Sequence, residues 1–329
     1  MELARQSLIP AISLVGPNPG VVNELYDLIR LFPAITRFSL YGEWQAVAYK
    51  SHPDLKLRAS EIDKDTKGIL RRISKQDVKR FGRALAKIST SNPLIVWAIS
   101  INQIEYYDNF VDVVVDAAKF CTHLGYDVLE YVILSSLANP FKNRVKDDGT
   151  SIALWLTGLS TFCAKLFRRY AYMDVSMAAL YIACQLKSSN IYDLIVLRDL
   201  VTHMAGILVR ENLSDHQLRC YAGGDTLKEQ AMALLREPGT NLGWKKSGSR
   251  LLNGLLETNL VGLLVVLIAQ ERGTSLFNVA HEHNSNLKLL GNLFDEVLSC
   301  SLPPLTCSVS RCFGPISRIY CVKLRFGVV

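Results

Sequence analysis

The sequence predicts an all-α protein, arranged as an α-solenoid or helical-repeat scaffold. Apolar residues recur at spacings of three and four over most of residues 1–299, and this period places them on one face of a helix. We find no train of alternating apolar and polar residues and no two-residue hairpin turn in this region. Short polar links join units of similar length, which favours antiparallel packing of consecutive helices.

Asn-Pro pairs mark the start of two helices. Asn18 is expected to cap a helix whose first residue is Pro19, because the asparagine side chain accepts an unpaired backbone N–H and proline needs no partner there. Asn92 and Pro93 begin a later helix in the same way. The apolar stripe of the first helix is expected to consist of Val21, Val22, Leu25, Leu28, Ile29 and Phe32.

Two further helices are predicted on either side of Gly125. One ends before this glycine, and Asp127 is expected to begin the next. The stripe that predicts the first of them consists of Phe110, Val113, Val114, Ala117, Phe120, Cys121 and Leu124.

Helices are also predicted in the segments 150–170, 174–189 and 193–207. In the last of these, His203 lies at the edge of the apolar face, which favours a core-edge or helix-terminal imidazole over a metal ligand or a base. Gly206 suits the left-handed position after a helix end. The apolar face itself consists of Leu194, Leu197, Leu200, Val201 and Met204.

Two regions depart from this helical pattern. Residues 208–248 mix glycine, proline and charge, and are predicted to form a long irregular excursion before the helices resume at Ser249. Residues 300–329 carry three prolines and no acidic residue, and they lack a helical period. We expect them to form a poorly ordered or loosely attached tail.

The composition favours an intracellular protein that does not enter a membrane. The longest apolar run, Leu260–Ala269, is half the length of roughly twenty residues that a bilayer crossing takes, so we expect a buried helix there. The first ten residues lack the cationic and apolar regions of a secretory signal. Cys121, Cys163, Cys184 and Cys220 lie scattered, mostly in apolar helical patterns, which is typical of reduced, buried thiols.

The residues that catalysis or metal binding would need are missing. The sequence has neither the Gly-Lys-Ser/Thr ending of a phosphate-binding loop nor a nucleophile elbow. His281 and His283 lie two apart, whereas two zinc ligands on one helix face are spaced by four. Asp63 and Asp65 lie among lysines, as in a solvated face. The late cysteines, Cys300, Cys307, Cys312 and Cys321, form no CxxC pair. We therefore expect no enzyme, no cofactor and no metal.

The strongest feature outside the predicted core is basic. Residues 50–87 carry twelve Lys and Arg against five Asp and Glu, in a chain of net charge +7. Spacing by four places much of this charge along a helix surface, and Ser74 with Asp77 is expected to cap a second helix there. The candidate contact residues are Lys67, Arg71, Lys75, Lys79, Arg83 and Lys87, with Arg72 and Arg80 beside them. The opposite side of the second helix is apolar, with Val78, Phe81, Leu85 and Ile88.

Three interpretations of this basic row remain open. Like charges at this spacing repel, by about 0.2–0.5 kcal/mol per pair, so local helix stability does not favour the row. Nucleic-acid phosphates or an acidic partner would compensate the repulsion, and an ordinary solvated face is the third possibility. No base-reading motif accompanies the row, so any contact with RNA or DNA would be directed at the backbone and weakly sequence-specific.

Five ordered blocks resemble a known family. They are "NPGVVNELYDLIRLFP", "RFSLYGEW", "SNPLIVWAI", "YDVLEYVILSSLANP" and "YDLIVLRDLVTHMAGI". Together they resemble the THO complex subunit 2 family, the large scaffold of the nuclear THO complex, from Glu2 to Ser299. Family members are several times longer, so the chain resembles an internal piece.

The resemblance implies a fold, a role and a set of partners. It implies a non-catalytic helical scaffold that organises the other THO complex subunits and, through the complex, an RNA helicase and export adaptors in the nucleus. In this view residues 1–90 form a helical segment with the basic stretch 50–87. Residues 91–299 form a MIF4G-like helical domain, and residues 300–329 lie outside the family. The alternative is another MIF4G-like helical RNA-binding module, acting in translation or decay.

Overall fold

The structure is a computed structural model that describes residues 2–74, 76–147, 149, 151–205 and 241–280, together with 289, 291–293, 295 and 297. Every regular element in these ranges is a helix, and Val145 and Ile152 form an isolated antiparallel bridge. The all-α prediction is therefore confirmed for the described residues. Their contacts divide the chain into two compact units, one formed by 1–142 with 154–162 and the other by 143–153 with the residues from 163 onward.

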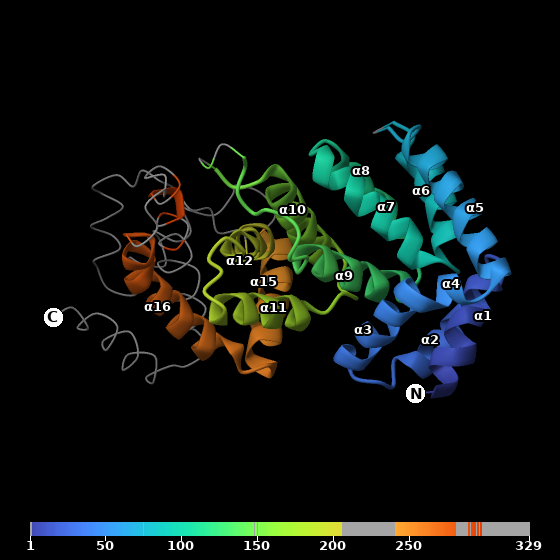
Figure 1. The fold of residues 1–329 in the computed structure, drawn as a ribbon, viewed down its shortest axis with the longest axis horizontal. Coiled ribbons are helices and arrows are strands. Elements are labelled where there is room, and N and C mark those ends of the chain that lie inside the picture. Colours follow the sequence, from blue (N-terminus) through green and yellow to red (C-terminus); the bar gives the residue numbers. More distant parts are fainter. Residues whose placement is uncertain are drawn as a thin grey trace. The chain divides into compact units, whose positions relative to one another are not determined.

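The first unit consists of short helices in sequence order (Figure 1). The domain boundary expected at residues 90/91 stays a prediction. Helices α5 and α6 before it and α7 after it contact one another within this unit. The elements are η1 (Ala4–Leu8), α1 (Ile9–Leu14), α2 (Pro19–Ile29), α3 (Ala34–Glu43), η2 (Trp44–Ala48), α4 (Tyr49–Ser51), α5 (Pro53–Leu70), α6 (Val78–Ser89), α7 (Pro93–Tyr106), α8 (Phe110–Ala117), η3 (Ala118–Phe120) and α9 (His123–Leu137).

The Asn-Pro pairs start α2 and α7 at the predicted residues, but the two asparagines act differently. The Asn18 side chain accepts a hydrogen bond of 3.1 Å from the backbone N–H of Gly20, as a cap does. Asn92 is fully buried and makes no such bond. Its amide donates to the Ser13 carbonyl at 3.0 Å and accepts from the Tyr49 hydroxyl at 3.1 Å, so it joins α7 to two earlier helices.

The helix break predicted at Gly125 is wrong. The chain breaks four residues earlier, where Cys121 is extended, and Gly125 lies inside α9. The true cap is Thr122, whose hydroxyl accepts from the Gly125 backbone N–H at 3.2 Å. The apolar stripe continues past this break to Leu124, so the periodicity of the sequence does not reveal where the earlier helix ends.

Asp127 therefore does not begin a helix but lies buried within α9. Its carboxylate accepts two hydrogen bonds from the Arg37 guanidinium, at 2.8 and 2.9 Å, and one from the Tyr41 hydroxyl at 2.7 Å. These contacts join α9 to α3. Burial, and then the negative charge of Asp127, raise the pKa of nearby Tyr26 to about 12.

The second unit contains α11 (Val175–Lys187), α12 (Leu194–Leu200), η4 (Val201–Ala205), α15 (Asn241–Glu257) and α16 (Leu260–Ala280), and α10 (Leu154–Arg169) ends in it. All five residues of the predicted α12–η4 face are buried, and His203 is half-buried, as expected for a core edge. Gly206, the proposed cap, lies outside the described residues.

Residues 208–240 of the predicted irregular excursion 208–248 lie outside the described residues. The remaining residues, 241–248, are helical. α15 begins at Asn241, eight residues before the expected Ser249. Gly248 signals a loop in the sequence, whereas in the structure it lies inside α15 and faces Ala205 at ordinary packing distance. The Ser247 hydroxyl donates to the Met204 carbonyl at the same contact.

Within the described residues, no single helix is both long and apolar enough to cross a bilayer. The segments Lys246–Glu257 and Leu260–Thr274 reach that length and composition only together, and they meet at a bend of 90°. The tail 300–329, with its four cysteines, and the His281–His283 pair lie outside the described residues.

Candidate nucleic-acid interface

The basic surface is carried by α5, α6 and the link of residues 71–77 between them. α5 begins after His52, whose ring nitrogen accepts from the Asp54 backbone N–H at 3.4 Å. α6 begins at Val78, after the expected Ser74–Asp77 cap. The Ser74 hydroxyl accepts from the Asp77 backbone N–H at 3.4 Å, but Asp77, at the N-cap position, makes no side-chain cap hydrogen bond. The two helices lie side by side (Figure 1).

α6 packs through its apolar side, as predicted. Val78 and Leu85 are buried, and Phe81 and Ile88 are half-buried. Gly82 lies on the packed side, where a Cβ would come within 3.1 Å of the Cα of Ala117 and 3.3 Å of the Phe120 ring. The close approach to α8 and η3 fixes which side of α6 faces outward.

The outward side of α6 carries Lys79, Arg80, Arg83 and Lys87, all of them exposed. The spacing of four places Lys79, Arg83 and Lys87 one above the other, about 6 Å apart along the helix axis. The Arg83 guanidinium lies 5.5 Å from the centre of the Phe120 ring. That contact holds the stem of the side chain on the helix surface and leaves the charge in solvent.

The row is not one continuous helical ridge, because a second helix begins within it, as predicted. Lys67 lies in the last turn of α5, Arg71 caps that helix and Arg72 lies in the link. The link interrupts the spacing of four, because residues on either side of it belong to different helices. Lys75 lies outside the described residues. The structure thus provides two groups of cations, one at the end of α5 and one along α6.

Most of these cations have no acidic partner in the part of the chain that the structure describes. Lys67 pairs with Asp63 at 2.8 Å, and both side chains are largely exposed. Among the described residues, Arg71, Arg72, Lys79 and Lys87 form no ion pair. Their positive charge is therefore not neutralised locally and is free to meet an anionic ligand.

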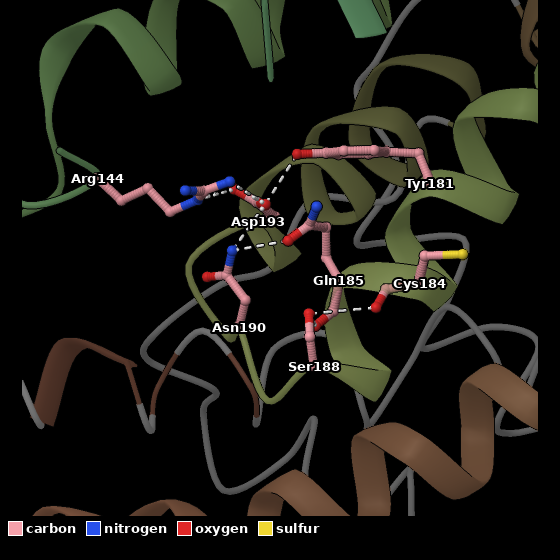
Figure 2. A network of polar contacts seen from close by, with 7 residues as sticks. All are labelled: Arg144, Tyr181, Cys184, Gln185, Ser188, Asn190 and Asp193. Carbon is pink, nitrogen blue, oxygen red and sulfur yellow. Dashed lines mark hydrogen bonds and ion pairs between the residues drawn. The ribbon is translucent and has the colours of Figure 1, made fainter. Parts of the chain in front are cut away.

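Half-buried polar residues in the second unit form a different kind of cluster around the buried Asp193 (Figure 2). The Arg144 guanidinium donates two hydrogen bonds to the carboxylate, at 3.0 and 3.1 Å. The Tyr181 hydroxyl donates at 2.9 Å and the Asn190 amide at 3.1 Å. Burial, and then Asp193, raise the pKa of Tyr181. Four donors saturate the carboxylate, so the cluster anchors the segment that contains Arg144 to α11 and α12.

Sequence patterns did not predict this cluster, because its members come from separate segments and only Asn190 and Asp193 are close in sequence. The described residues contain no group of three or more His, Cys, Asp or Glu that could hold a metal ion. Asp63 and Asp65 lie on α5, and the Asp63 carboxylate forms an ion pair with Lys67.

Comparison with known proteins gives consistent matches along the chain. Residues 1–83 match the family model described as THO complex subunit 2 N-terminus, and residues 85–160 match the model described as transcription- and export-related complex subunit. α5 lies within the first match, and α6 spans the junction of the two.

Individual relatives match over a longer range. The chain is 39% identical over 297 residues to human THO complex subunit 2, which covers 90% of this chain and 18% of the relative. The Arabidopsis thaliana protein of the same name is 36% identical over 295 residues, covering 88% of the chain and 16% of the relative. The Saccharomyces cerevisiae protein is 28% identical over 300 residues, covering 90% and 18%. The chain thus spans less than a fifth of the length of these relatives.

Proposed function

The chain belongs to the THO complex subunit 2 family, and from this membership we propose that it is a non-catalytic scaffold segment of the nuclear THO/TREX complex. The observation that carries the proposal is the pair of adjacent family matches over residues 1–160, extended by identity to relatives over nine-tenths of the chain. In this role it binds other THO subunits and, through them, an RNA helicase and export adaptors. It thereby couples transcription to mRNA processing, packaging and export.

The arrangement of helices supports a scaffold. Several pairs of consecutive helices contact one another in the described part of the chain, as in α5–α6, α6–α7 and α11–α12. Such stacking builds long surfaces that several partners can share. An α-solenoid path with a MIF4G-like segment in residues 91–299 is the form we propose for it.

A second part of the proposal concerns RNA. The exposed α6 cations, together with Arg71 and Arg72 after the end of α5, lack acidic partners among the described residues, which favours a ligand rich in negative charge. The step of about 6 Å between successive cations of α6 suits the repeated phosphates of an extended strand better than a compact acidic patch. We therefore assign this surface to the RNA backbone.

Affinity purification tests the scaffold role. The tagged chain is incubated with nuclease-treated nuclear extract, and bound proteins are identified by mass spectrometry. Enrichment of the other THO subunits over the tag alone is the expected result, and it should persist when Lys79, Arg83 and Lys87 are replaced by glutamate. If instead the chain retains translation or decay factors from cytoplasmic extract and no THO subunit from nuclear extract, the alternative function holds and this proposal fails.

A further inference from the structure

The link between α5 and α6 presents an exposed serine directly after two arginines. Residues Arg71, Arg72, Ile73 and Ser74 form the sequence Arg-Arg-Ile-Ser, and both arginines and the serine are exposed. Neither arginine forms an ion pair within the described part of the chain, so both guanidinium groups can be bound by another protein.

The Ser74 hydroxyl is also weakly held. Its contacts are with the backbone N–H of Asp77 at 3.4 Å and with the Asp77 carboxylate at 3.5 Å, both at the long limit for a hydrogen bond. The backbone around it lies outside α5 and α6. A segment of this kind can take the extended form that a kinase groove binds at a small energetic cost.

We propose that Ser74 is a phosphorylation site for a serine/threonine kinase that selects arginine at the second and third positions before the serine, and that the phosphate regulates the basic surface. Carboxylates in the substrate groove of such a kinase bind guanidinium groups in a two-point geometry, which provides the selection. In the reaction the Ser74 oxygen attacks the γ-phosphorus of MgATP. The bond from that phosphorus to the β–γ bridging oxygen breaks, ADP leaves, and the hydroxyl proton passes to the catalytic carboxylate of the kinase.

The regulatory half rests on the RNA contact proposed above. Phosphoserine adds a charge of about −1.5 to −2 and strong acceptor oxygens at pH 7. Arg71 and Arg72 lie three and two residues away in sequence, so the new phosphate competes for the guanidinium groups that RNA would use. It also repels nearby RNA phosphates. Phosphorylation should therefore weaken RNA binding, and loss of two phosphate contacts should lower the salt slope by about 1.4.

The first experiment tests the site without RNA. The folded chain is incubated with MgATP and an arginine-directed kinase, and phosphate at each serine is quantified by mass spectrometry. Ser60 is the internal control, because it is also exposed and follows Arg58 by two residues, but it lies within α5 and donates to the Leu57 carbonyl at 2.8 Å. Near-stoichiometric phosphate at Ser74 is expected, with little at Ser60 and none in Ser74→Ala.

A matched pair of samples separates recognition from access. Arg71→Gln with Arg72→Gln should lose at least tenfold in the rate of phosphorylation while keeping native helicity. A synthetic peptide of residues 68–80 should be phosphorylated about as fast as the chain. If the peptide is modified and Ser74 in the folded chain is not, the link is inaccessible and the proposal is overturned.

The second experiment tests regulation with a single-stranded oligouridylate probe. Phosphorylated chain should bind it roughly tenfold more weakly than the parent at low salt, and Ser74→Ala treated with kinase should bind like the parent. Equal binding by the phosphorylated and parent chains overturns the regulatory half. A parent that binds no oligouridylate overturns the RNA assignment and this regulatory half together, while phosphate incorporation still decides the site.

Discussion

Arg37 and Asp127 form a two-point ion pair between α3 and α9, with distances of 2.8 and 2.9 Å. Their side chains are 16% and 8% exposed, so both charges are largely withdrawn from water. Tyr41 adds a third hydrogen bond to the same carboxylate. The pair joins residues ninety apart in sequence, and each partner depends on the other, because a buried charge without its partner is costly.

Asp127→Ala should therefore lower the free energy of unfolding by about 3–5 kcal/mol, since it leaves the Arg37 charge buried and unpaired. Urea denaturation followed by circular dichroism measures this change. The control is Asp27→Ala in α2, where the residue is exposed and a change within about 0.5 kcal/mol is expected. Similar small losses in both variants would show that the ion pair does not stabilise the fold.

Asp127 also shows what the sequence could and could not predict. Caps such as Asn18 and Asp174 act on the backbone two residues ahead, so the local sequence carries their role. Asp127 and Asn92 look like caps in sequence, yet their partners are Arg37 and Ser13, far away along the chain. Periodicity predicts which helices exist, but it cannot assign a polar residue to a partner on another helix.

The basic surface, too, was predictable only in part. Exposure of the cations follows from the amphipathic pattern of α6, and a second helix within the basic row was predicted, although it begins at Val78, after the expected Ser74–Asp77 cap. The extent of α5 was not, because nothing in the spacing of the basic row marks its end at Leu70. The acidic partner of Lys67, by contrast, is one helical turn away and could have been read from the sequence.

Gly82→Ala should destabilise the chain, because the new methyl group would lie 3.1 Å from the backbone of Ala117. We expect a loss of about 1–3 kcal/mol, as for other overpacked sites. Gly68→Ala in α5 is the matched control: nothing lies within 4 Å of its Cβ position, and alanine there should stabilise the helix by about 0.5–1 kcal/mol. Opposite shifts in thermal midpoint check both, and a stabilised Gly82→Ala would contradict the packing of α6 on α8.

Cysteine reactivity should differ among the thiols. Cys184 is exposed, whereas burial raises the pKa of Cys121 to about 12, so that almost no thiolate forms at pH 8. Iodoacetamide at pH 8 should modify Cys184 first and Cys121 far more slowly, as measured by peptide mapping. Because the folded pKa lies above the ordinary 9.0, this thiol stabilises the fold fully below pH 9 and loses that effect as the pH rises towards 12. Equal rates of modification of Cys184 and Cys121 at pH 8 would contradict the predicted difference in reactivity.

The outward side of α6 should govern RNA binding. Replacing Lys79, Arg83 and Lys87 with glutamate should weaken binding about equally across sequences, because phosphates are the same in each. Each lost contact should remove roughly 0.7 from the salt slope, or about 2 for the three. Titrations of single-stranded RNA at several salt concentrations measure both effects.

Two controls separate direct contact from charge and from folding. Glutamate at Lys50, Lys56 and Lys64 changes the net charge equally, but these exposed residues lie outside the proposed contact set, so most of the binding should remain. Leu85→Ala should destabilise the chain by about 2–5 kcal/mol through lost packing and reduce binding only indirectly. If the α6 variant keeps native helicity and melting and still binds RNA like the parent at low salt, the surface is solvated or meets an acidic protein. The RNA assignment would then fail, and the scaffold role would stand.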